Sequence, residues 1–189
     1  MSAGHFHVHG PHDHEAEHRA QHDPFASRVA VMTAIFATLG ALFGYMAGET
    51  QNEALISKNE AAIRRTEASD QWNFYQAKSS KQNLAEVAVV LTSGEQQARY
   101  QKEAERYKKE KDEIVPEAKK LEQQTKEAEE RSEASLRVHY RWAQAMTLIQ
   151  VAIALAAITI LTRSTGLQYI SYAVAAVSVA VGILALARV

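Results

Sequence analysis

The sequence predicts an all-α membrane protein with three transmembrane helices and a long, coiled-coil-like antiparallel helical hairpin between the first and the second. Two observations predict this class. Three stretches of 20, 21 and 24 residues contain no Asp, Glu, Lys or Arg: 29–48, 142–162 and 164–187. A bilayer core about 30 Å thick is crossed by roughly 20 apolar helical residues. In contrast, 35 of the 43 charged residues lie between Glu49 and Arg141.

A polar, histidine-rich tail occupies residues 1–22, and the first transmembrane helix is expected at residues 24–48. Asp23 is suited to cap this helix, and Pro24 is suited to its first turn, where the missing N–H is not needed. Three glycines four residues apart would let a second helix approach closely: Gly40, Gly44 and Gly48. The alternative is that glycine is simply common in membrane helices.

A charged helical hairpin is expected at residues 49–141, with its turn near residues 92–94, where Thr-Ser-Gly interrupts the helical pattern. No Gly or Pro lies between Glu49 and Ser93, so the first helix should continue from the bilayer into the hairpin. At 1.5 Å per residue, each arm would extend about 65–70 Å if unbroken. Pro116 predicts a kink or a break near residues 114–115.

Both arms show a seven-residue recurrence of apolar residues, which is typical of paired helices. In the second arm the recurrence is Tyr100, Tyr107, Ile114, Leu121 and Ala128, with partly polar residues between. In the first arm it is Ile56, Ile63, Ala77, Leu84 and Leu91, interrupted by Asp70. Such thin seams favour a multi-chain bundle, and we expect a homo-oligomer.

An aromatic cluster stands out on the first arm. Trp72 and Tyr75 are three residues apart and share a helix face. Aromatic side chains on a polar helix seek a partner surface. We therefore expect them, with Tyr100, Tyr107, Ile114 and Leu121, to contact the facing arm or another chain.

The second and third transmembrane helices are expected at residues 142–163 and 167–188, joined by the turn Ser164-Thr165-Gly166. Tyr140 and Trp142 fit an interfacial aromatic belt. Small residues four apart predict two further faces for helix packing: Ala152 with Ala156, and Ala176 with Ala180. No Asp, Glu, Lys, Arg or His lies in the middle of a span, which disfavours an ion-coupled carrier.

The orientation depends on which arginines are counted. Arg19, Arg28 and Arg163 lie on the N-terminal side, whereas the short tail on the other side offers only Arg188. The positive-inside rule then favours a cytoplasmic N-terminus and a periplasmic hairpin. Counting the basic flanks of the long loop reverses this result: Lys58, Arg131, Arg137 and Arg141.

Seven of the eight histidines lie in the first 22 residues: His5, His7, His9, His12, His14, His18 and His22. Neutral imidazoles clustered in this way bind zinc, copper or nickel. The tail is therefore a candidate for metal binding or delivery at the membrane, and no other cofactor is indicated. The alternative is a solvated tail that binds metal adventitiously or responds to pH.

Several function classes are excluded by composition. The chain has no cysteine, which rules out disulfides, thiolate metal sites and cysteine nucleophiles. Its formal net charge of −1, with both signs interspersed, argues against a nucleic-acid surface. His139 is the only histidine beyond the tail, and no motif places a nucleophile beside it. We therefore expect no enzymatic activity.

The segment Ala68-Ser69-Asp70-Gln71-Trp72-Asn73-Phe74-Tyr75-Gln76-Ala77-Lys78, placed after one span and before two others, resembles the family called domain of unknown function 4337. This resemblance implies a small bacterial inner-membrane protein built of helices, and it brings no known activity or catalytic residue. We expect a membrane-anchored scaffold or accessory subunit that contacts lipid and presents its helices to itself or to a larger membrane complex, with metal handling as the alternative.

Overall fold

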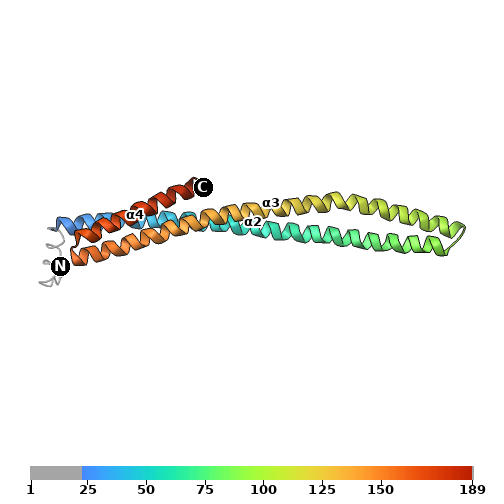
Figure 1. The fold of residues 1–189 in the computed structure, drawn as a ribbon, viewed down its shortest axis with the longest axis horizontal. Coiled ribbons are helices and arrows are strands. Elements are labelled where there is room, and N and C mark those ends of the chain that lie inside the picture. Colours follow the sequence, from blue (N-terminus) through green and yellow to red (C-terminus); the bar gives the residue numbers. More distant parts are fainter. Residues whose placement is uncertain (1–22, 189) are drawn as a thin grey trace, which may run out of the picture. The chain divides into compact units, whose positions relative to one another are not determined.

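The computed structural model describes residues 23–188, and within this range it contains three α-helices and no strand: α2 (Pro24–Leu91), α3 (Glu95–Thr162) and α4 (Thr165–Leu186) (Figure 1). Each helix includes a window that is long and apolar enough to cross a membrane. The predicted all-helical class is therefore confirmed, and each of the three helices overlaps one of the charge-free stretches.

Two compact units make up the described chain, and both α2 and α3 contribute to each. The apolar unit comprises residues 23–50 and 137–188, and the charged unit is Gln51–Leu136. The helix α2 passes from one unit into the other without a break, as the lack of Gly and Pro after Glu49 predicts. The apolar unit thus combines parts of α2 and α3 with all of α4.

The ends of the helices follow from local chemistry. The Asp23 carboxylate accepts hydrogen bonds from the backbone N–H groups of Phe25 and Ala26, at 3.1 and 3.3 Å, and so caps α2. Between α2 and α3, Gly94 adopts a φ of +66°, which strains any residue with a Cβ. Ser164 caps α4. The predicted turn near residues 92–94 therefore coincides with the gap between α2 and α3.

Alanine dominates the seam of the charged unit. The helix α2 buries Ala54, Ala61, Ala68 and Ala85, and α3 buries Ala104, Ala118, Leu121, Thr125, Ala128 and Ser132. The recurrence predicted for the first arm is wrong as a seam, because Ile56, Ile63, Leu84 and Leu91 are 58–78% exposed and Ala77 is exposed as well. Short side chains let two helix backbones approach, so the smaller residues are the ones that face α3.

Of the kink or break predicted at Pro116, the break does not occur: α3 runs from Glu95 to Thr162. Proline in a helix interior removes one backbone hydrogen bond and crowds the preceding turn. Because Pro116 is exposed, the carbonyl that loses its partner can be hydrated. The helix therefore continues through the proline.

Candidate functional site

The segment that carries the family resemblance lies on α2 in the charged unit, and one of its faces meets α3. Trp72, Tyr75 and Lys78, spaced three residues apart, are each half-buried. Phe74 lies between them in sequence but points elsewhere and is 58% exposed. A spacing of three residues is close to one helical turn, so it places Trp72, Tyr75 and Lys78 along one side of the helix.

Trp72 joins the two helices by a single hydrogen bond. Its indole Nε1–H donates to Glu122 Oε1 of α3 at 2.8 Å. The Tyr75 ring meets the Trp72 ring edge to face, with the ring centroids 5.6 Å apart. This arrangement satisfies the indole donor, and it brings the positive edge of one ring to the negative face of the other.

Lys78 is the centre of an ionic and aromatic cluster one turn further along. Its ammonium group pairs with the Glu110 carboxylate and lies 5.8 Å from the centroid of the Tyr107 ring. A second cation contacts the same two groups. The Arg106 guanidinium lies 4.8 Å from the centroid of the Tyr107 ring and 3.4 Å from the Glu110 carboxylate. Each cation therefore has both a carboxylate and an aromatic face within reach.

A second lysine lies over the other tyrosine: Lys111 Nζ is 5.4 Å from the Tyr75 centroid.

The pKa of Glu110 is lowered from its ordinary value, chiefly by the hydrogen bond from Lys78 and further by the charges of Lys78 and Arg106. Burial opposes this shift. Glu110 is therefore held as a carboxylate by its cationic neighbours, as a structural counter-ion would be.

Further contacts between α2 and α3 occur on both sides of this cluster. Arg65 pairs with Glu129, and Glu60 pairs with Arg131 at 2.7 Å. The buried Ser132 hydroxyl donates to the Ala54 carbonyl at 2.9 Å. Residues with higher numbers in α2 thus meet residues with lower numbers in α3.

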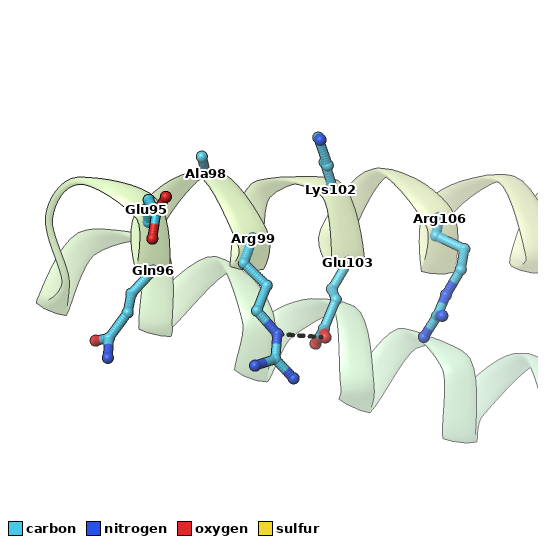
Figure 2. A pocket seen from close by; sticks show the side chains of 7 residues that line it. All are labelled: Glu95, Gln96, Ala98, Arg99, Lys102, Glu103 and Arg106. Atoms are coloured by element: carbon cyan, nitrogen blue, oxygen red, sulfur yellow. Dashed lines mark ion pairs between the residues drawn. The ribbon is translucent and has the colours of Figure 1, made fainter.

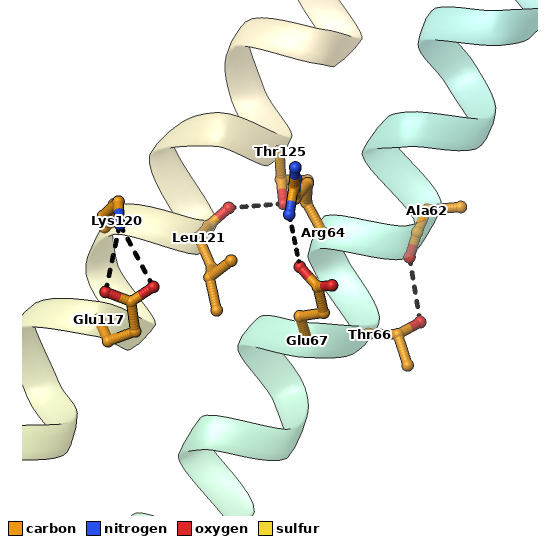
Figure 3. A network of polar contacts seen from close by, with 8 residues as sticks. All are labelled: Ala62, Arg64, Thr66, Glu67, Glu117, Lys120, Leu121 and Thr125. Carbon is orange, nitrogen blue, oxygen red and sulfur yellow. Dashed lines mark hydrogen bonds and ion pairs between the residues drawn. The ribbon is translucent and has the colours of Figure 1, made fainter.

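Other polar contacts stay within one helix. In Figure 3, Arg64 pairs with Glu67 on α2 at 2.9 Å, and Lys120 pairs with Glu117 on α3 at 3.4 Å. The Thr66 and Thr125 hydroxyls donate to backbone carbonyls four residues earlier. Such bonds support each helix but do not hold the two together.

The surface of the charged unit has shallow grooves lined by charged and polar groups. The groove beside Trp72 holds about 460 Å³ and is lined by residues that include Arg65, Asn73 and Glu122. Figure 2 shows another, of about 650 Å³, formed by α3 residues 95–106, where Arg99 and Glu103 pair at 3.6 Å. Both grooves are lined by charges of both signs.

In the apolar unit, the predicted glycine face is only partly in contact. A Cβ added at Gly40 would lie 3.2 Å from Ile149, and one added at Gly44 would lie 3.3 Å from Met146, so both glycines face α3. At Gly48 nothing lies within 4 Å. Two of the three glycines therefore admit close helix packing within the chain.

The predicted alanine faces also differ from each other. Ala152 and Ala156 are completely buried, whereas Ala176 and Ala180 are exposed on α4. The face of α4 that packs consists instead of Ser171, Ala175, Ser178, Gly182 and Ala185. The alternating spacing of four and three among these small residues is the signal that sequence reasoning missed.

Two serines of α4 bond to the backbone of α3. Ser171 Oγ donates to the Ala152 carbonyl at 2.8 Å, and Ser178 Oγ donates to the Ala145 carbonyl at 2.6 Å. Hydroxyl groups commonly link helices in membranes in this way. Both serines are completely buried, so these bonds also satisfy groups that water cannot reach.

Trp142 is packed inside the apolar unit. It is 5% exposed, and its ring lies 5.7 Å from the Phe43 ring. Nearby, His139 Nδ1 lies 2.8 Å from the Ala47 carbonyl, which makes this histidine a link between α3 and α2. Both residues therefore serve the packing of the apolar unit.

The predicted metal ligands of the tail, His5 to His22, lie outside the described residues. Within residues 23–188, no three His, Asp or Glu side chains are grouped so as to hold a metal ion. The remaining predicted contact residues are half-buried or buried on the face of α3 that carries the seam: Tyr100, Tyr107, Ile114 and Leu121.

The side chains of the cluster are thus engaged with one another: an indole with a carboxylate, an ammonium with a carboxylate and a ring. The arrangement joins two helices and is suited to a contact rather than to a reaction.

Comparison with known proteins gives one match. No curated protein and no solved structure matches the chain. The family model described as "Domain of unknown function (DUF4337)" matches residues 25–188, which include all three helices and the aromatic segment. The chain therefore belongs to this family.

Proposed function

We propose that the protein is a non-enzymatic scaffold of the bacterial inner membrane that forms a homo-oligomer through its helices. The observation that carries this proposal is the continuity of α2 and α3, each of which passes unbroken from an apolar window into a charged arm. A helix that is apolar at one end and charged at the other suits a membrane anchor joined to a water-exposed contact surface.

The charged arms form an antiparallel hairpin in this proposal. The contacts Ala54 with Ser132, Trp72 with Glu122 and Lys78 with Glu110 support it, since the residue numbers rise in α2 as they fall in α3. The aromatic and ionic cluster around Lys78 then fixes the register of the two arms, because a shift by one heptad would separate every one of these pairs.

The particle mass tests the proposal of self-assembly. Purified in native-membrane discs, the full chain should give particles of two or more 20.9 kDa protomers. A particle with a single protomer would contradict the scaffold. Retention in the membrane pellet after alkaline carbonate extraction is the accompanying test of the three spans.

The absence of cysteine allows a direct test of orientation. Ser93→Cys lies in the turn of the charged unit and Thr165→Cys at the start of α4, and both positions are exposed. With the arms in the periplasm, a membrane-impermeant maleimide added to intact spheroplasts should label the first variant and not the second. The reverse pattern would place the arms in the cytoplasm, and equal labelling would contradict three spans.

Metal handling by the histidine tail is separated from the scaffold by deleting residues 1–21. The scaffold proposal expects particles of unchanged mass from the truncated chain. The metal alternative expects loss of function, together with defined zinc or copper stoichiometry when the isolated tail peptide is titrated calorimetrically.

A further inference from the structure

The outer face of the α2 arm has a composition that a water-exposed helix face rarely has. This face comprises the positions one, two and five residues after each of the seam positions 54, 61, 68, 75, 82 and 89. Between residues 55 and 91 it has 17 positions, all exposed, and Asp70 is the only charged residue among them. The other charged residues of the arm lie in the seam or beside it.

The equivalent face of α3 in the charged unit is of the usual kind. It comprises the positions one, two and five residues after 97, 104, 111, 118, 125 and 132. Of its 17 positions, again all exposed, 13 carry a charge. The two arms have the same heptad construction and contact each other, so the contrast between 1 and 13 reflects a difference in what lies outside each arm.

Large apolar side chains lie on the uncharged face in two groups. Leu55, Ile56 and Ile63 are 56–60% exposed at one end, and Leu84, Val90 and Leu91 are 72–82% exposed at the other. The positions 56, 63, 84 and 91 are separated by multiples of seven, which is the spacing needed to contact a second long helix along its length.

We infer that this uncharged face of α2, from Leu55 to Leu91, is the contact surface between two copies of the chain, related by a two-fold axis parallel to the arms. The inference rests on the proposed self-assembly and specifies its surface and its symmetry.

Self-complementarity identifies the partner. An uncharged face with apolar groups at both ends needs a counterpart of the same kind, and within Gln51–Leu136 the outer face of α3 is too charged to supply one. The same face on a second copy does supply it, with the same length and the same seven-residue repeat. Contact between identical surfaces is isologous, and it closes after two chains.

The membrane makes the pairing parallel. Two copies inserted with the same orientation leave the bilayer at the same residue, so equal residue numbers lie at equal heights. Ile63 then meets Ile63 of the second copy, and Leu84 meets Leu84. The face is about 54 Å long and about 10 Å wide, which gives roughly 500 Å² per chain, at the lower limit for a specific interface.

Asp70 is the one residue that opposes this pairing, since two like charges meet when the copies align. Like charges opposite each other across an interface disfavour that partner. Asp70→Asn should therefore tighten the dimer roughly two- to fivefold, as the loss of a repulsion between exposed charges permits. When Asp70→Lys chains and wild-type chains are mixed in equal amounts, random pairing would make half of the dimers mixed. The attraction between the lysine introduced at position 70 of one chain and Asp70 of the other should raise the mixed fraction above one half.

Cysteine crosslinking of the full chain in native-membrane discs tests the surface. Ile63→Cys and Leu84→Cys should each form disulfide dimers on mild oxidation. Glu127→Cys and Glu105→Cys, which are exposed on the outer face of α3, should not. Co-expressed Ile63→Cys and Leu84→Cys should form no mixed crosslink, because parallel copies keep these two positions far apart.

Each other outcome overturns a defined part of the inference. An oligomer that crosslinks through the α3 positions and not through the α2 positions overturns the surface while leaving self-assembly intact. A mixed crosslink between positions 63 and 84 overturns the parallel two-fold axis. A particle with one protomer overturns the proposed self-assembly, and the surface with it. Mixed dimers of Asp70→Lys and wild type at or below the statistical half would overturn pairing through Asp70.

Discussion

Helices pack closely in both the apolar unit and the charged unit, but the polar groups that support the packing differ between the two. Both bury alanine where helices meet, and both use a buried serine that donates to a backbone carbonyl of the next helix: Ser178 in the apolar unit and Ser132 in the charged unit. Within residues 23–188, the charged unit adds ion pairs and cation–aromatic contacts along the facing lengths of α2 and α3, such as Lys78 with Glu110 and Tyr107. The apolar unit has an ion pair at the ends of these helices, between Asp23 and Arg163 at 2.9 Å.

In the proposed membrane arrangement, the solvent around each unit explains this difference. In lipid, apolar side chains gain little by leaving the surroundings for a helix contact, so close fit and hydroxyl bonds hold the helices. In water, a seam of alanines buries little apolar area, and charged side chains can pair across it while their outer parts stay hydrated. The same backbone geometry is therefore stabilised by fit in one unit and by fit with charge in the other.

The largest effect should come from filling the tightest contact of the apolar unit. A Cβ at Gly182 would lie 3.0 Å from Phe43 and 3.4 Å from Trp142. Gly182→Leu should cost about 1–3 kcal/mol through overpacking, and Gly48→Leu, with nothing within 4 Å, should cost much less. Unfolding of the two variants in mild detergent, followed by circular dichroism, measures the difference. Equal losses would contradict the packing of α4 on this site.

The corresponding test in the charged unit is Trp72→Ala. It removes an aromatic contact with Tyr75 and the hydrogen bond to Glu122, so we expect a loss of about 1–2 kcal/mol. Phe74→Ala removes a similar ring from an exposed position of the same helix and should be nearly neutral. Thermal unfolding of the two full-length variants distinguishes Trp72→Ala from Phe74→Ala. A larger loss from Phe74→Ala would mean that Phe74 rather than Trp72 makes the contact.

The two serines allow the units to be compared directly. Ser178→Ala should cost about 0.6–1 kcal/mol and Ser132→Ala about 0.5–1 kcal/mol, since each removes one hydroxyl bond to a carbonyl. Each unit holds one of the two tryptophans, so fluorescence in a Trp72→Phe or a Trp142→Phe background reports on one unit at a time. Loss of more than about 2 kcal/mol from either variant would show that the hydroxyl does more than this bond explains.

The smallest expected effect is the pH dependence of stability that Glu110 contributes. The pKa of Glu110 is lowered in the folded protein by the bond from Lys78, so its contribution is complete above the ordinary carboxyl pKa of about 4.3 and is lost as pH falls through the lowered value. At neutral pH Glu110→Gln should be slightly less stable than the wild type. The two melting temperatures should begin to approach each other below about pH 4.3 and should coincide only below the lowered pKa of Glu110. A gap that persists at low pH would point to packing rather than charge.

The helices themselves could be predicted from composition because their signals are local. Charge-free stretches of 20 residues or more and the lack of Gly and Pro after Glu49 predict the spans and the continuity of α2. Pro116 predicts a kink or a break, and only the break is excluded: the sequence does not say whether a proline faces water or the neighbouring helix, and on the exposed side the lost hydrogen bond is tolerated.

What the sequence determined by itself is the helical class, the separation of apolar from charged segments and the turn at Gly94, since each depends on residues close together in the chain. Which of two seven-residue stripes on α2 meets α3 was decided only by the tertiary structure. Sequence periodicity shows that a stripe exists, but closeness of approach selects the alanines for the seam and leaves Ile56, Ile63, Leu84 and Leu91 outside.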